Sequence, residues 1–429
     1  MPVPQAAARD ALRTAAHGCV RDATGTDDVD GVAPRWVVGA RDTATMAAVL
    51  SACAAGELSV VVRGAGTKLG WGAPPRRCDV LVDTLADPVG DSGDTTLFDH
   101  AAGDLVVTAS AGLGLADLQA RLAPAGQRLA VDPARPGTVG GLVATGEAGP
   151  LRLLYGRVRD LVIGVTAVRA DGVVAHAGGT VVKNVAGYDL GKLLTGSYGT
   201  LAAITEVTFR LHPVPAAQAW VTVPASSTAD IRQRIQAAIH SQTVPAAVEL
   251  DRPGPSAADV SVLLEGTSAG VAARAAALAG ELGPDARVAD TPPPWWGREP
   301  GSPAGAPVPV LLKATCPIGA IDALLEAVDA AAGAATGAHV RGSAGAGAVI
   351  VGLTGADMAD PSRVAPVVQT LRAKVGELGG TVVLQTAPAA VKEAVDVWGP
   401  VPAMGLMHAI KRQFDPAARL APGRFVCGI

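Results

Sequence analysis

Short runs of β-branched residues, each followed by a glycine-rich turn, dominate the first half of the chain. This pattern is typical of buried strands joined by tight turns, with few helices. The predicted strands are Ser59–Arg63, Asp79–Asp83, Leu105–Ser110, Arg128–Val131, Leu161–Arg169, Val173–His176 and Val207–Leu211, and a helix is predicted over Leu115–Ala123.

From about Trp220 the pattern changes, and strands alternate with longer helices. The predicted strands are residues 220–224, Val260–Glu265, Val310–Ala314, Ala348–Leu353 and Thr381–Gln385, and the predicted helices are Ile231–His240, Val271–Leu282, Ile318–Ala331 and Ser362–Leu378. Two such passes predict one antiparallel sheet with helices on one face. The proline-rich stretch Thr291–Pro309 is expected to be an exposed loop.

A chain of 429 residues is too long for one core, so two or three domains are expected. We predict an N-terminal segment (1–29), two domains (30–215 and 216–395) and a C-terminal helix and tail (396–429) that docks back on the first domain. The net charge of −4 gives no electrostatic case for nucleic acid. Prolines and charges interrupt the apolar runs, so no membrane span is expected. The sequence predicts a cytoplasmic protein, which partners could hold at the inner membrane.

The five cysteines are dispersed, with no C-x-x-C pair: they are Cys19, Cys53, Cys78, Cys316 and Cys427. The seven histidines show no H-x-H or H-E-x-x-H pattern. No metal or iron–sulfur site is therefore predicted within this chain.

Three polar, glycine-rich segments carry the candidate chemistry. The turn GAGTKLG follows a predicted strand, and Asp83 lies about 20 residues later, a spacing found in dinucleotide-binding folds. The following GWGAPP breaks a helix, so a dinucleotide fingerprint is rejected and an anion-binding loop is predicted. A plain tight turn remains the alternative. The loop Asp132–Gly146 is the second segment, and two such loops can bind the two phosphates of a pyrophosphate. The third segment, Val181–Ile204, has the residues of a clamp on a large phosphorylated cofactor.

Four blocks in this order, RGAGTKLG, VDPARPGTVGGLVATG, VRDLVIG and VKNVAGYDLGKLLTGSYGTLAAITEVTFRL, closely resemble the FAD-binding domain of the vanillyl-alcohol-oxidase (PCMH-type) flavoproteins. The KNVAGYDL…GSYGTLAAITE block and the terminal FDPAARLAPGRF are similar above all to FAD-binding subunits of bacterial glycolate oxidases. The resemblance covers residues 30–215 and the tail. It implies an α+β fold, with a PCMH-type FAD-binding domain of two subdomains and a smaller α+β cap domain.

The resemblance also implies which residues hold FAD. The pyrophosphate would be wrapped by Arg63, Gly64, Ala65, Gly66, Thr67, Lys68, Asp132, Pro136, Gly137 and Thr138. The flavin side would be lined by Gly140, Gly141, Thr145 and Gly146, and the ribityl-to-adenine part by Tyr198, Gly199, Thr200 and Ile204. No histidine lies in these loops, so non-covalent FAD is expected.

The family's C-terminal Glu-His motif and metal-binding histidine pair are missing from this chain. His408 is the remaining candidate base, although a packing role is the alternative. Arg159 and Lys183 could supply a cation near the flavin, or could be ordinary surface charges. The resemblance implies the FAD-binding subunit of a glycolate (2-hydroxy acid) oxidase complex that forms glyoxylate, with a second flavoprotein subunit and an iron–sulfur subunit. The alternatives are a self-sufficient FAD-dependent 2-hydroxy acid dehydrogenase and a flavin-binding structural subunit without a redox role.

Overall fold

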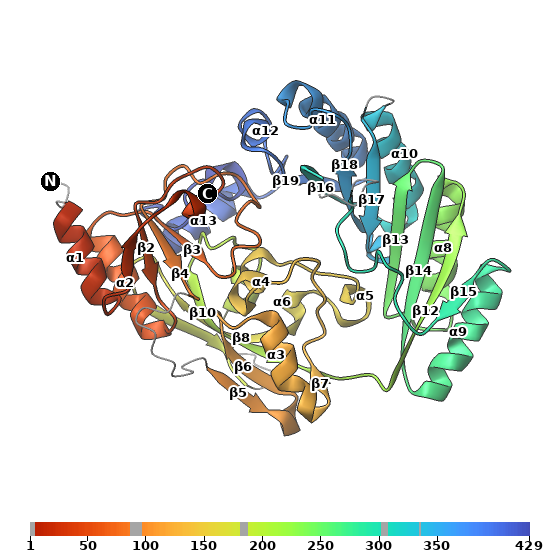
Figure 1. Cartoon of the computed structure of the whole chain (residues 1–429), viewed down its shortest axis with the longest axis horizontal. Coiled ribbons are helices and arrows are strands. Elements are labelled where there is room, and N and C mark those ends of the chain that lie inside the picture. Colours follow the sequence, from red (N-terminus) through yellow and green to blue (C-terminus); the bar gives the residue numbers. More distant parts are fainter. Residues whose placement is uncertain (1–4, 86–96, 181–187, 302–307, 334–335) are drawn as a thin grey trace.

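A computed structural model describes residues 5–85, 97–180, 188–301, 308–333 and 336–429 of the chain. Two sheet-containing parts lie side by side (Figure 1). We call the described residues from 5 to 213 the N-terminal lobe, and those from 217 to 386 the cap. The predicted domain boundaries remain predictions.

The first sheet of the N-terminal lobe has the strand order β1-β2-β4-β3, in which β2, β4 and β3 are parallel. Its elements are α1 (Gln5–Ala15), β1 (Val20–Asp22), β2 (Trp36–Gly39), α2 (Thr43–Ala55), β3 (Val60–Arg63) and β4 (Val80–Asp83). Helix α2 packs between this sheet and the second one, since Met46 shares a buried cluster with Val82 and Val168. Leu12 of α1 belongs to the same cluster, so the helix is part of this core.

The second sheet of the lobe is antiparallel, with the order β5-β6-β10-β8-β9. Its strands are β5 (Phe98–Ala101), β6 (Val106–Ser110), β8 (Val162–Val168), β9 (Val174–Gly178) and β10 (Ala203–Arg210). A small pair, β7 (Gln127–Arg128) and β11 (His212–Pro213), lies beside it. Buried leucines and valines join the sheet to α3 (Leu115–Leu122), α4 (Val139–Thr145), α6 (Val158–Leu161) and α7 (Leu190–Leu194).

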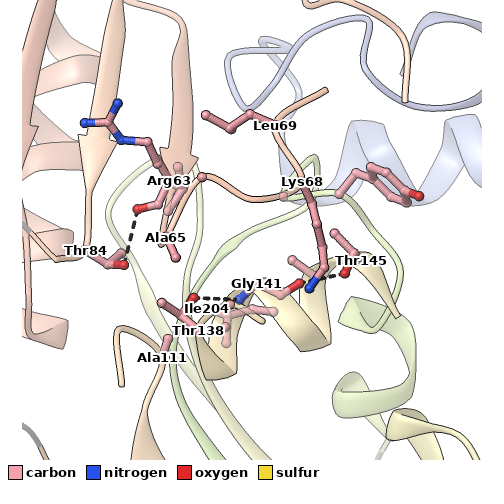
Figure 2. Close-up of a pocket in the computed structure, with 18 of the residues that line it drawn as sticks. Arg63, Ala65, Lys68, Leu69, Thr84, Ala111, Thr138, Gly141, Thr145 and Ile204 are labelled. Carbon is pink, nitrogen blue, oxygen red and sulfur yellow. Dashed lines mark hydrogen bonds between the residues drawn. The ribbon is translucent and has the colours of Figure 1, made fainter. Parts of the chain in front are cut away.

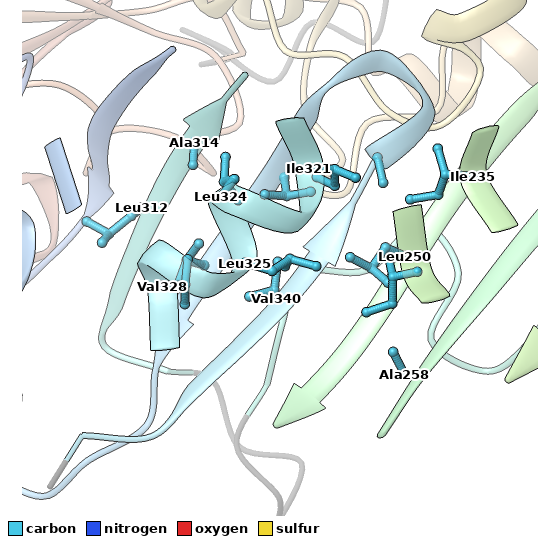
Figure 3. Close-up of a cluster of buried hydrophobic side chains, with 14 of the residues drawn as sticks. Ile235, Leu250, Ala258, Leu312, Ala314, Ile321, Leu324, Leu325, Val328 and Val340 are labelled. Carbon is cyan, nitrogen blue, oxygen red and sulfur yellow. The ribbon is translucent and has the colours of Figure 1, made fainter. Parts of the chain in front are cut away.

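The cap is built on an eight-stranded antiparallel sheet with the order β15-β12-β14-β13-β17-β18-β16-β19. Its strands are β12 (Ala217–Ala225), β13 (Ala247–Gly254), β14 (Ala257–Gly266), β15 (Arg287–Ala289), β16 (Val310–Thr315), β17 (Ala338–Gly342), β18 (Ala348–Leu353) and β19 (Thr381–Thr386). Four helices cover one face: α8 (Thr228–His240), α9 (Ser268–Leu282), α10 (Ile321–Ala332) and α11 (Pro361–Glu377). Figure 3 shows leucine and isoleucine side chains of α10 packed onto Leu312, Val340 and Leu250 of the strands.

The opposite face of the cap sheet is polar and lies toward the N-terminal lobe. Side chains alternate between the faces of a strand, so the residues next to buried Leu250 and Leu312 point to this second face. They include Glu249 of β13 and Lys313 of β16. Across the gap, Glu265 of β14 pairs with Arg128 of the lobe, with an Nη2 to Oε2 distance of 2.6 Å. The polar face is therefore partly buried between the two parts.

The C-terminal tail returns from the cap to the N-terminal lobe (Figure 1). Helices α12 (Ala389–Ala394), α5 (Arg152–Tyr155) of the lobe and α13 (Met404–Phe414) complete the fold. After α13, the chain pairs with the edge of β3, where the Val60 N–H donates to the Arg419 carbonyl at 2.8 Å. The Lys411 ammonium of α13 is buried and donates to the Thr200 carbonyl (2.6 Å), the Leu420 carbonyl (3.1 Å) and the Asp415 carboxylate (2.7 Å).

The predicted α+β class, with an antiparallel second sheet covered by helices on one face, is confirmed. In the cap, the sequence prediction missed β13, β15 and β17, and in the N-terminal lobe it missed β1, β2 and β5 and the helices α1 and α2. In β13, acidic residues occupy alternate positions because they face the polar interface, so the strand has the composition of a loop. The segment Asp132–Gly146 was predicted to be a loop, but its second half forms helix α4 (Val139–Thr145). Among the described residues, no helix is long and apolar enough to cross a membrane.

Replacing Lys411 by methionine should destabilise the docked tail. The change leaves the Asp415 carboxylate buried without its cation, which costs about 3 kcal/mol in unfolding free energy. Arg412→Met, on the exposed face of the same helix, is the matched control and should change stability by less than about 0.5 kcal/mol. Urea unfolding of both variants measures the difference. Equal stabilities for the two would show that Lys411 does not hold the tail.

Candidate functional site in a cavity of the N-terminal lobe

A cavity lies between the loop that follows β3 and helix α4 of the N-terminal lobe (Figure 2). Its volume is about 830 Å³, open solvent at its mouth included. The lining comes from residues 61–69, 137–145 and 198–204, with Thr84, Ala111 and the tail residue Arg424. Of the predicted FAD-binding residues, it brings together Arg63, Gly64, Ala65, Gly66, Thr67, Lys68, Gly137, Thr138, Gly140, Gly141, Thr145, Tyr198, Gly199 and Ile204.

The loop after β3 presents unused backbone N–H groups. Among the hydrogen bonds of the described residues, none has a backbone N–H of residues 64–68 as its donor. Gly66 has φ +74°, a conformation that glycine adopts without strain. A Cβ on Gly64 would lie 2.2 Å from Thr138 Oγ1, so this position needs the smallest residue. Successive free N–H groups on a turn of this kind form an anion-binding concavity.

Two carbonyl-bound cations hold this loop from its other side. Arg424 Nη2 donates to the carbonyls of Leu69 and Trp71, at 2.7 Å each. Lys392 Nζ donates to the carbonyls of Gly70 and Gly72 and pairs with Asp30. The carbonyls on this side are thereby occupied, which fixes the conformation of the loop before any ligand binds.

The charged side chains of Arg63 and Lys68, which were predicted to wrap the pyrophosphate, are paired with carboxylates of the protein. The Arg63 guanidinium points away from the Thr138–Gly141 side of the cavity in Figure 2. It pairs with Asp83 (Nη2 to Oδ2, 2.6 Å) and Asp27 (Nη1 to Oδ1, 3.1 Å). Arg63 therefore contributes its backbone to the lining, and its charge stabilises the sheet. Lys68 Nζ lies 2.5 Å from Glu147 Oε2, and burial raises the pKa of that glutamate.

Arg424 was not anticipated as a site residue. Its side chain is buried with 4% exposure, and its Nη1 atom has no hydrogen-bond partner. A buried guanidinium N–H without an acceptor is costly, so this atom is suited to an anionic or carbonyl group of a ligand. The residue lies far from the glycine loops in the sequence, and only the returning tail brings it there.

Four predicted FAD-binding residues, Asp132, Pro136, Gly146 and Thr200, are not among the described residues that line this cavity. Thr200 is buried behind it, and its hydroxyl donates to the Ser197 carbonyl at 2.7 Å. The Asp132 carboxylate accepts the Leu151 N–H at 3.0 Å and so holds the chain before α5. Burial raises the pKa of this carboxyl to about 7. Within the segment Asp132–Gly146, the cavity is lined by Gly137, Thr138, Gly140, Gly141 and Thr145 and not by Asp132.

The candidate catalytic residues are not gathered at this cavity. His408 is half-buried on α13 and Arg159 is exposed on α6. Neither is among the described residues that line the cavities considered in this section. Lys183 and the first part of the Val181–Ile204 segment lie outside the described residues.

A cleft of about 1330 Å³, open solvent included, separates the N-terminal lobe from the polar face of the cap sheet. Thr145 and Tyr198 line both this cleft and the first cavity, so the two spaces adjoin. Tyr198 packs edge-on against Trp398, with ring centroids 4.9 Å apart, and Trp398 packs against Phe425. This aromatic group forms one wall of the cleft.

Three cations line the same cleft: Arg152 and Arg157 from the lobe and Lys313 from β16. No hydrogen bond or ion pair within the described residues involves their side-chain nitrogens. Desolvation, with the nearby positive charges of Arg152 and Arg157, lowers the pKa of Lys313 to about 8. Unpaired cations in a cleft mark a candidate site for an anionic ligand. Alternation in LLKAT could have indicated Lys313, because its neighbours Leu312 and Ala314 face the opposite side.

Residues 34–178 match a family of proteins described as "FAD binding domain". The lining residues 198–204 and Arg424 lie outside the matched region. The backbone N–H groups of residues 64–68 and the unpartnered Arg424 Nη1 fit the oxygen-rich pyrophosphate and the carbonyls of FAD.

Curated relatives match parts of the chain. The glycolate oxidase subunit GlcE of Escherichia coli is 45% identical over 117 residues, which are 27% of this chain and 33% of the relative. A D-lactate dehydrogenase of Archaeoglobus fulgidus is 35% identical over 188 residues, 42% of this chain and 41% of the relative. The glycolate oxidase subunit GlcD of Bacillus subtilis is 30% identical over 230 residues, which are 51% of this chain and 46% of the relative. This chain thus spans a third to a half of the length of these relatives.

Solved structures share the fold over nearly the whole chain. An alkyldihydroxyacetonephosphate synthase has a TM-score of 0.70 at 14% identity, covering 98% of this chain and 85% of the other. The VAO-type flavoprotein MtVAO615 of Myceliophthora thermophila also has a TM-score of 0.70, at 15% identity, covering 97% and 94%. The two-part architecture is therefore that of VAO-type flavoproteins.

Gly66→Ala should weaken FAD binding about tenfold, because a Cβ at φ +74° costs about 1–2 kcal/mol and shifts the N–H groups of the loop. Gly70→Ala is the matched control in the same loop. Its Cβ meets open space and its φ is negative, so FAD affinity should be unchanged. Titration of the apoprotein with FAD, followed by flavin fluorescence, gives both constants. Equal affinities for the two variants would remove the loop from the site.

Asp132→Asn should keep its FAD and become more stable than the parent as the pH rises. The carboxyl titrates near 3.8 when unfolded and near 7 when folded, so the parent loses stability between these pH values while the asparagine variant does not. The expected gain is small at pH 4 and about 4 kcal/mol at pH 7.5. Thermal unfolding across this range, with the retained flavin measured in parallel, checks both statements. Loss of FAD would instead place Asp132 in the cofactor site.

Proposed function

We propose that the chain is an FAD-dependent oxidoreductase subunit that acts on small 2-hydroxy acids. The observation that carries the proposal is the junction of two spaces: a cavity that fits FAD, and a cleft lined by three unpaired cations. A 2-hydroxy acid is an anion, and its oxidation requires its C2 atom to lie beside the flavin. The named relatives, glycolate oxidase subunits and a D-lactate dehydrogenase, support this substrate class.

In the proposed site, the FAD pyrophosphate is bound by the backbone N–H groups of residues 64–68, and Arg424 Nη1 donates to another oxygen of the cofactor. Neither histidine nor cysteine occurs among the described lining residues, which supports non-covalent binding. Four further residues are proposed to support the loops that line the cavity without contacting FAD themselves: Asp132, Pro136, Gly146 and Thr200.

The cations of the cleft take separate roles. Arg152 and Arg157 are proposed to bind the substrate carboxylate, because a guanidinium stays charged and matches a carboxylate with two parallel hydrogen bonds. Bound FAD supplies the chemistry of accepting a hydride from C2. Lys313 Nζ, with its lowered pKa, is proposed to take the proton of the C2 hydroxyl group in its neutral form. Lys313 thereby takes the role for which the sequence suggested His408, which does not line this cleft.

The chain is further proposed to be the FAD-binding subunit of a glycolate oxidase type of complex, which oxidises glycolate to glyoxylate. Two named relatives are subunits of glycolate oxidases. A second flavoprotein subunit and an iron–sulfur subunit are the proposed partners. Among the described residues, no group of three or more His, Cys, Asp and Glu side chains could hold a metal ion, so an iron–sulfur centre would come from another chain. Purification from native cells without either partner would contradict this assembly.

The function is tested by recording the flavin spectrum under anaerobic conditions before and after adding glycolate, lactate or glycerate. Bleaching of the oxidised flavin band in the isolated chain would support direct oxidation of the acid. Bleaching only in the native complex would support a dependent subunit. A flavin that stays oxidised in both, with every acid, would contradict the proposed activity.

The rate of flavin reduction should rise with pH through about 8, because only neutral Lys313 accepts a proton and its pKa is lowered to about 8. Arg152, Arg157 and Glu147 are the charged groups that act on this lysine. Lys313→Arg keeps the charge but cannot lose it, so reduction should be at least 100-fold slower and lack the rise near pH 8. Stopped-flow measurements from pH 6.5 to 9.5 follow both proteins. An unchanged pH profile in the variant would exclude Lys313 as the base.

A further inference from the structure

A second polar space opens from the cation cleft into the interface between lobe and cap. It measures about 670 Å³, open solvent included, and shares Arg152, Lys313 and Gln385 with the cleft. Its floor is the polar face of β13, β18 and β19, and its roof is the chain around residues 147–150 of the lobe. We call this space the side pocket. It shares no lining residue with the first cavity.

Elsewhere on the same polar face, charged groups have partners. Glu265 binds Arg128, Tyr155 and Gln218 through its two carboxylate oxygens. Asp251 binds His339 and Arg341, at 2.6 Å each. The buried carboxylates Glu265 and Asp251 are therefore both paired, as buried charges require.

Three side chains of the side pocket, Glu249, Gln385 and Trp71, have a buried polar atom with neither a hydrogen bond nor an ion pair. Glu249 is 3% exposed and Gln385 is 8% exposed, and the Oε1 atom of each is buried without a hydrogen-bond partner. An unsatisfied buried oxygen destabilises the folded state. Both come from separate strands, β13 and β19, and both line the same space. Orphan groups that converge on one pocket indicate a ligand that donates hydrogen bonds to them.

The hydrogen-bonding groups of the side pocket favour a neutral polar ligand group. Its acidic side chains are Glu147, Glu249 and Glu299, and its cations besides Arg152 and Lys313 are Arg298 and Arg341, of which Arg341 is bound to Asp251. A second carboxylate has no hydrogen to donate to the Oε1 atoms of Glu249 and Gln385, so it would leave both unsatisfied. A hydroxyl group both donates and accepts, which suits a carboxyl and a carboxamide side by side. Burial raises the pKa of Glu249 to about 8, so that it can also donate near neutral pH.

We propose that the side pocket binds hydroxyl groups on the carbon chain of the substrate, beyond C2, through Glu249 and Gln385. The preferred substrate class is thus a 2-hydroxy acid with one or more further hydroxyl groups. This inference rests on the proposed function, in which Arg152 and Arg157 bind the carboxylate and Lys313 faces the C2 hydroxyl. Glycolate, with two carbons, occupies the cleft alone and leaves the orphan oxygens unsatisfied.

Glycerate and lactate form a matched pair of test substrates, because they differ only by the C3 hydroxyl group. With the FAD-loaded protein and acids of the same configuration, kcat/KM should be at least tenfold higher for glycerate. A site built to bind a hydroxyl group discriminates strongly against the analogue that lacks it. Malate, in which a carboxylate extends the chain, should be a poorer substrate than glycerate. A preference for lactate or malate would overturn the proposal.

Two variants assign the preference to the side pocket. In Gln385→Leu the ratio of kcat/KM for glycerate over lactate should fall at least fivefold, toward unity. Gln218→Leu, at a glutamine on the same sheet face that binds Glu265, is the matched control and should keep the parental ratio. An unchanged ratio in Gln385→Leu would place hydroxyl recognition elsewhere.

A binding measurement separates this proposal from the oxidation itself. Glycerate should raise the unfolding temperature of the FAD-loaded protein more than lactate does at equal concentration, and Gln385→Leu should abolish the difference. If no acid reduces the flavin but this difference is found, the activity fails while the hydroxyl site stands. If lactate and glycerate reduce the flavin equally and stabilise the protein equally, the activity stands and the hydroxyl site is wrong.

Discussion

The burial of a polar sheet face between two parts of the chain is the constraint on which this structure depends. A sheet with helices on one side normally turns its other side to water, yet the cap turns that side toward the N-terminal lobe. Each polar group there must find a partner or a ligand, because an isolated buried charge is strongly disfavoured. Glu265 and Asp251 find protein partners. The Oε1 atoms of Glu249 and Gln385 have no hydrogen-bond partner, and both side chains line the side pocket together with Lys313.

Buried cations also determine the conformation of the loop that follows β3. The C-terminal tail and α12 supply Arg424 and Lys392, which donate to carbonyls of residues 69–72. With its carbonyls held from outside, the loop keeps the N–H groups of residues 64–68 free for an anion. Lys411 in turn anchors the tail to the Thr200 carbonyl. Segments more than 300 residues apart thus prepare one binding surface before the cofactor arrives.

The sequence was most informative where chemistry is local. GAGTKLG and the PGTVGG segment are recognisable because free N–H groups and close backbone approach require glycine, and the structure brings both segments to one cavity. Arg63 shows the limit of this reasoning: its position was predicted, but its guanidinium is committed to Asp27 and Asp83. Lys411 is buried although no local pattern of the sequence indicates it. Alternation along β16 indicates which face Lys313 occupies, but Arg424 and Arg152 could not be placed, since only the packing of lobe, cap and tail brings these three residues to the site.

A crystal structure of the chain with FAD and a bound 2-oxo acid product, such as hydroxypyruvate, tests the central claim most directly. The account predicts FAD in the cavity between the glycine loops and α4, with the product carboxylate on Arg152 and Arg157. Lys313 Nζ should lie at about 3 Å from the C2 oxygen, within hydrogen-bond distance. A product bound away from these cations, or a flavin ring that faces away from the cap, would contradict it.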